Sequence, residues 1–68
     1  MSNHVYQILE FTGSSTQSSD AAVQNAIAKA ANSYQQIKWF EVVETRGQVQ
    51  DGQVAHWQVT IKVGHTLP

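Results

Sequence analysis

Residues 37–63 read IKWFEVVETRGQVQ, then DG, then QVAHWQVTIKV, and they hold the clearest structural signal in the chain. Two long runs rich in β-branched and aromatic residues flank Asp51 and Gly52. An Asp-Gly pair favours a two-residue type I′ turn, in which both central residues have positive φ. The segment therefore predicts a β-hairpin with strands over residues 37–50 and 53–63.

The turn also predicts which residues face one another across the hairpin. With Gln50 opposite Gln53, the later pairs are Thr45 with Gln58, Glu41 with Lys62, and Phe40 with Val63. Side chains alternate between the two faces of a strand. One face then gathers the apolar residues Phe40, Val42, Trp57, Val59, Ile61 and Val63, and we interpret it as the core face. The other gathers Trp39, Glu41, Val43, Thr45, His56, Gln58, Thr60 and Lys62.

The preceding residues predict one strand and one helix. The strand covers residues 4–12 and is largely apolar on both faces, which is typical of a strand covered on both sides. Residues 13–19 are small and polar and are expected to connect it to the helix. Ser18 is the favoured N-cap, and the helix is expected to run to about Tyr34. Its inner face follows a helical spacing: Val23, Ala26, Ile27, Ala30 and Tyr34.

The predicted order of elements is strand, helix, strand, strand, which is an α+β fold. The first two strands run the same way across the helical crossover. If the third strand lies between them, every neighbouring pair is antiparallel. We therefore expect a three-stranded antiparallel sheet of order 2-3-1, wrapped around the single helix.

Composition narrows the class of protein further. The chain has 68 residues and no cysteine, so we expect one domain over residues 1–68 without disulfides. Its net charge is −1 and it has no basic run, which argues against nucleic-acid binding. No apolar stretch is long enough to span a membrane, and residues 1–4 lack the features of a signal peptide, so a cytoplasmic location is expected. A domain this short has only marginal stability as a monomer, which favours a homo-oligomer.

Several short segments occur along the chain in an order that is typical of one protein family. They are VY (residues 5–6), Glu10, TGSS (12–15), WFEVVE (39–44), RG (46–47), DGQVAHWQV (51–59) and KVG (62–64). This set resembles the dodecin family of small flavin-binding proteins, over nearly the whole chain. The resemblance implies a hollow homododecamer of 23 symmetry. It also implies that flavins (riboflavin, FMN or FAD) bind at subunit interfaces, stacked in pairs between Trp39 side chains.

Each of the three candidate site residues has a structural interpretation and a ligand-binding interpretation. By spacing alone, Trp39 is an interface tryptophan, Gln58 an exposed strand glutamine and Arg46 a solvated charge beside Glu44. The resemblance implies that Trp39 stacks on the isoalloxazine ring and that Gln58 pairs with its pyrimidine edge. The Gln58 amide offers the donor and acceptor that this edge needs. For Arg46 the resemblance implies a place near the phosphate-bearing tail of the ligand.

One position departs from the family pattern. After the last glycine, where the family often has an aromatic residue and an arginine, this chain has His65 and Thr66. The missing cation at Thr66 weakens any preference for FMN over riboflavin. It also weakens the case for phosphate binding and for coenzyme A as a partner.

The favoured function is therefore flavin storage and sequestration, with electron transfer from the indole quenching the flavin's excited state. We identify no catalytic residue: the sequence has no Ser-His-Asp set, phosphate-binding glycine loop or recognisable pair of acid and base. His4, His56 and His65 have no metal-ligand spacing, so no metal site is expected. Two alternatives remain, a small flavin-dependent oxidoreductase and a structural oligomer without flavin.

Overall fold

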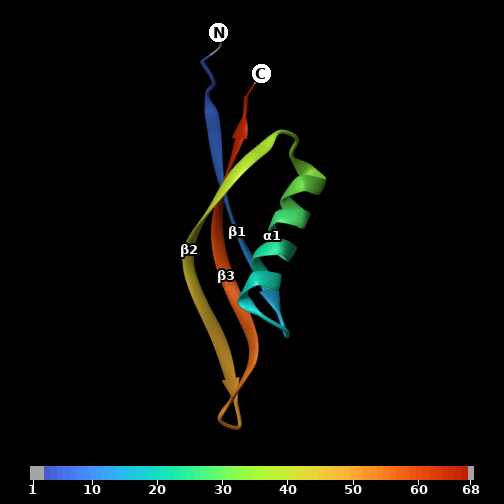
Figure 1. The fold of residues 1–68 in the computed structure, drawn as a ribbon, viewed down its shortest axis with the longest axis vertical. Coiled ribbons are helices and arrows are strands. Elements are labelled where there is room, and N and C mark those ends of the chain that lie inside the picture. The colour runs from blue at the N-terminus through green and yellow to red at the C-terminus, as the bar shows by residue number, and fades with distance from the viewer. Residues whose placement is uncertain (1–2, 68) are drawn as a thin grey trace.

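A computed structural model describes residues 3–67 and shows one helix packed on one face of a three-stranded sheet (Figure 1). The elements are β1 (Tyr6–Ser15), α1 (Ser19–Ser33), β2 (Ile37–Gln50) and β3 (Gln53–Thr66). The strand order is β1-β3-β2, and both neighbouring pairs are antiparallel. The predicted α+β fold and its strand order are thus confirmed. The expectation of no signal peptide rests on residues 1–4, and residues 1 and 2 of these lie outside the described residues.

The hairpin turns where the sequence predicts it, at Asp51 (φ 54°) and Gly52 (φ 75°). Its register is as predicted near both ends, where Gln50 pairs with Gln53 and Phe40 with Val63. The expected pairing of Thr45 with Gln58 is wrong.

Two compensating bulges explain that error. The register shifts by one residue between Val42 and Glu44 and shifts back between Gln48 and Val49. Between them, Arg46 lies opposite Gln58, and Thr45 lies opposite Val59 on the face that holds the helix. A bulge inserts one unpaired residue, so the side chains that follow it change faces relative to a regular strand.

Three strand boundaries also differ from the prediction. β1 begins at Tyr6 and continues through Gly13 to Ser15, and β3 extends beyond Val63 to Thr66. The small polar residues after Thr12 are typical of a loop, but here they pair with the middle of β3, as Gly13 does with Val59. Pairing with a neighbouring strand overrides local propensity in this segment.

The helix begins as predicted, because the Ser18 side chain accepts a hydrogen bond of 3.0 Å from the Ala21 backbone N–H. Small residues on α1 allow it to lie close to the sheet. The buried core consists of Ala22, Ala26, Ala30, Val59, Ile61 and Val63. Ala22 was missing from the predicted face, whereas Val23 and Ile27 lie at the edge of this core and are partly buried.

Gly13 lies where α1 packs tightly against β1. A Cβ atom at this position would overlap the Ala22 carbonyl oxygen and lie 2.9 Å from Ala26 Cβ. We expect Gly13→Ala to destabilise the protein by about 1–3 kcal/mol, since the helix must move away from β1. Thermal unfolding measures this loss. Gly47→Ala is the control, because its nearest neighbour would be the His56 carbonyl oxygen at 3.2 Å. An equal loss in both variants would contradict this account.

A large part of the apolar surface is left uncovered. α1 packs mainly on β1 and β3, while β2 curves away from it (Figure 1). Phe40 and Val42 face the helix side of the sheet, yet they are 49% and 48% exposed. The accessible surface of the chain is 4930 Å², whereas about 4,200 Å² is expected for a compact monomer of 7.5 kDa.

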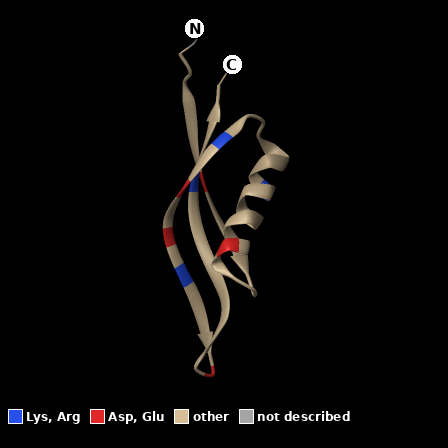
Figure 2. Ribbon diagram, viewed as in Figure 1, with Lys and Arg blue, Asp and Glu red and all other residues tan. Residues whose placement is uncertain are grey.

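Charged side chains are few and do not shield this apolar surface from water. Figure 2 shows lysine and arginine spread singly over α1, β2 and β3. Within residues 3–67, no helix is long and apolar enough to cross a membrane.

Candidate functional site

All three predicted site residues lie on the face of the sheet opposite the helix, which we name the open face. The even-numbered residues of β3 point to this face, and Gln58 is one of them, whereas Trp39 and Arg46 each pair with one. Trp39 pairs with Gly64, and Arg46 pairs with Gln58. The neighbouring odd-numbered residues Val59, Ile61 and Val63 point into the core under α1. The prediction that Trp39 and Gln58 share the face away from the core is confirmed.

Trp39 is 38% exposed, and its indole lies over Gly64. The Tyr6 ring stands beside it, with the ring centroids 6.2 Å apart and the planes at 62°. A large aromatic side chain that is half-exposed on a sheet is a natural platform for a flat ligand or a second subunit.

Gln58 and Arg46 form a second group, farther along the open face. Gln58 is half-buried, and its Nε2 lies 3.4 Å from His56 Nε2. Its cross-strand partner is Arg46, because of the bulge at Val43. The bulge therefore brings two predicted site residues together that a regular hairpin would have placed on opposite faces.

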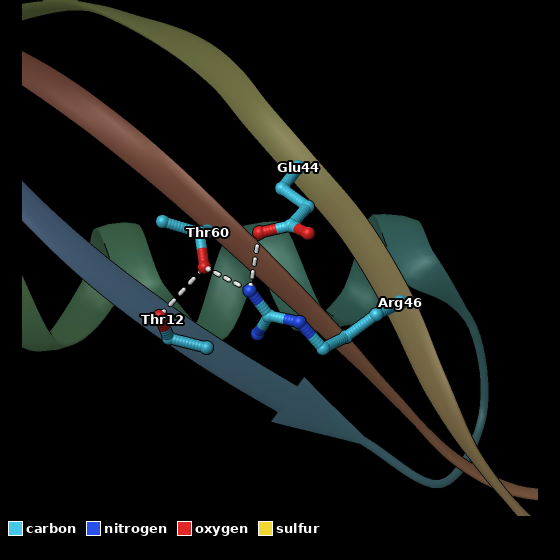
Figure 3. A network of polar contacts seen from close by, with 4 residues as sticks. All are labelled: Thr12, Glu44, Arg46 and Thr60. Atoms are coloured by element: carbon cyan, nitrogen blue, oxygen red, sulfur yellow. Dashed lines mark hydrogen bonds and ion pairs between the residues drawn. The ribbon is translucent and has the colours of Figure 1, made fainter.

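Arg46 belongs to a polar network that crosses all three strands (Figure 3). Its Nη2 donates to Glu44 Oε1 at 2.6 Å and lies 3.5 Å from Thr60 Oγ1. Thr60 Oγ1 and Thr12 Oγ1 share a further hydrogen bond of 2.8 Å. The guanidinium charge is thus already paired with a carboxylate. Thr12 and Thr60 were not identified from the sequence; the only available signal was the presence of Thr60 on the predicted open face.

Trp39 and Gln58 are far apart within one chain. Their levels on β3 are set by Gly64 and by Gln58 itself, six residues apart. At about 3.3 Å per residue, the separation along the strand is roughly 20 Å. This distance greatly exceeds the length of a three-ring isoalloxazine, so one chain cannot place both side chains on the same flavin.

His56 and His65 make local polar contacts. His65 Nε2 lies 3.0 Å from Gln7 Oε1 on the neighbouring strand, and the Tyr34 ring is 5.4 Å away from the imidazole. Among residues 3–67, no three histidine, aspartate or glutamate side chains come together as a metal site would require.

Comparison with known proteins agrees with the observed fold. The dodecin family model matches residues 5–68. A curated dodecin of Thermus thermophilus is 38% identical over 63 residues, covering 93% of this chain and 91% of that protein. The solved dodecin of Streptomyces davaonensis is 49% identical, with a TM-score of 0.93 and 98% coverage of both chains. The dodecin of Streptomyces coelicolor is 48% identical, with a TM-score of 0.94 and coverage of 100% and 97%. The chain belongs to the dodecin family.

Proposed function

We propose that this protein is a non-enzymatic flavin store that assembles from twelve chains and binds flavin between them. The observation that carries the proposal is the open face itself. It presents an exposed indole at Trp39 and an amide at Gln58, too far apart to serve one ligand unless different chains contribute them. Family membership supplies the ligand class, a flavin.

The two side chains suit the two parts of an isoalloxazine ring. The Trp39 indole is flat, polarisable and electron-rich, so it can stack on the ring and quench its excited state by donating an electron. The Gln58 amide can both donate and accept hydrogen bonds, as the pyrimidine edge requires. A flavin stacked in this way has little room for a substrate, which favours storage over oxidoreductase chemistry.

Titration with riboflavin tests this proposal. We expect flavin fluorescence to be quenched as protein is added, with a shift in the visible absorbance and an end point of one flavin per chain. A structural oligomer without flavin would leave the fluorescence of riboflavin, FMN and FAD unchanged. That outcome would contradict the proposed function.

The paired charge of Arg46 leads to a prediction about specificity. Because Glu44 already neutralises it and Thr66 supplies no second cation, we expect riboflavin to bind at least as tightly as FMN. Salt should have little effect on the affinity for either flavin, since the exposed phosphate of FMN would lack a free positive partner. Fluorescence titrations at low and high ionic strength measure both quantities. A strong preference for FMN that disappears in high salt would contradict the prediction.

Glu44→Gln provides the matched variant. It keeps an oxygen that can accept the Arg46 hydrogen bond but removes the negative charge. The affinity for FMN should then rise relative to riboflavin and become sensitive to salt, as for any exposed pair of opposite charges.

A further inference from the structure

The contact between Trp39 and Gly64 has a defined geometry. A Cβ atom built on Gly64 would overlap the indole, with Cε2 nearest, followed by Cζ2 and by Nε1 at 2.6 Å. Cε2 is a ring-fusion atom bonded to both of the others. A group that is nearest to this atom must therefore approach through the face of the ring rather than from its edge. The indole thus lies with one face against the backbone of β3.

Neighbouring residues hold the indole in that place. The register of β2 shifts between Ile37 and Trp39, so that Trp39 faces Gly64 on the open face while Ile37 faces His65 on the helix side. Tyr6, from β1, stands against the indole in a T-shaped arrangement. Gly64 is itself buried, so the space above its Cα is filled by the indole.

We propose that Gly64 is a positioning residue that lays Trp39 flat on the sheet and leaves a single indole face for a ligand. One free face per indole limits the site to one stacked flavin per chain. The ligand part of this inference rests on the proposed function, whereas the packing of Trp39 on Gly64 does not. Gly64 acts through Trp39 and need not touch the flavin.

Gly64→Ala tests the ligand part. The added methyl group must lift or tilt the indole, so we expect the affinity for riboflavin to fall by about tenfold, equivalent to the loss of one aromatic stack. Gly47→Ala is the control, because Gly47 lies on β2 away from Trp39 and its methyl group would not meet the indole. Its nearest neighbour would be the His56 carbonyl oxygen at 3.2 Å, a tight contact that needs a shift of only a few tenths of an ångström. Its affinity should equal that of the unmodified protein. Unchanged affinity in Gly64→Ala, or an equal loss in Gly47→Ala, would overturn the proposal.

A double-mutant cycle without flavin tests the packing part separately. Gly64→Ala should lower the melting temperature of the otherwise unmodified protein. In a Trp39→Ala background the same change should have little effect, because the methyl group enters space that the indole has left. If Gly64→Ala alone does not fold, the double variant should restore folding. An equal loss in both backgrounds, or a double variant that also fails to fold, would overturn the packing argument. Failure of the proposed function would leave this cycle intact and remove only the flavin readout.

Discussion

Trp39→Ala should lower the affinity for riboflavin by at least about a hundredfold. The stack is worth about 0.5–1.5 kcal/mol beyond burial. Each 100 Å² of apolar surface returned to water costs about 2.5 kcal/mol more. Together these losses exceed the roughly 2.8 kcal/mol that correspond to a hundredfold change. Titration of riboflavin fluorescence measures the effect. An affinity within threefold of the unmodified protein would contradict the assignment of Trp39.

Three further variants distinguish stacking on Trp39 from hydrogen bonding by Gln58 and from a site on the helix side of the sheet. Trp39→Phe should weaken binding and restore part of the fluorescence, because a phenyl ring is a poorer electron donor. Gln58→Ala should cost about 1–3 kcal/mol of affinity while the bound flavin stays dark, since the stack remains. Trp57→Ala is the control, because Trp57 packs against the core on the helix side and should affect stability instead. Loss of flavin from an intact Trp57→Ala oligomer, with Trp39→Ala unaffected, would place the site on the other face.

The second large effect concerns assembly. We expect light scattering to give a mass near 90 kDa, for twelve chains of 7.5 kDa each. Among residues 3–67, the fully buried large side chains are Val59, Ile61 and Val63, while apolar residues on both faces stay exposed. A chain with so small a core needs contacts with other copies to be stable. A monodisperse monomer or dimer at micromolar concentration would contradict this prediction.

A charge on the open face should prevent that assembly. Ile8 is 55% exposed and pairs with Gly64, beside the position of Trp39. Ile8→Lys would bury an unpaired ammonium group at a subunit interface, so we expect smaller species by light scattering. The control is Asn32→Lys, on the exposed side of α1, which should assemble normally.

Periodicity and turn chemistry were sufficient to predict most of the fold. The Asp51-Gly52 turn, the Ser18 cap and the alternation on β3 each depend on local residue types, and all three were predicted correctly. The bulge at Val43 could not be predicted in this way, because the residues around it have the same strand propensity as a regular strand. Tertiary pairing, invisible in a single segment, also kept Gly13 in β1.

The candidate site, too, could be predicted from the sequence only in part. The side of the sheet that Trp39 and Gln58 share followed from the hairpin turn. The pairing of Arg46 with Gln58 did not, since it depends on the bulge. The contact between Trp39 and Gly64 could not be predicted either, because the direction in which an indole lies is decided by packing rather than by sequence spacing.

Sedimentation velocity followed at the visible absorbance of riboflavin tests the central claim in one measurement. Our account predicts that this absorbance moves with a particle near 90 kDa, at one flavin per chain. The prediction combines the ligand, the oligomer and the shared site, because only an assembly of several chains can bring Trp39 and Gln58 together. Visible absorbance that remains with free riboflavin, while the protein sediments alone, would contradict the account.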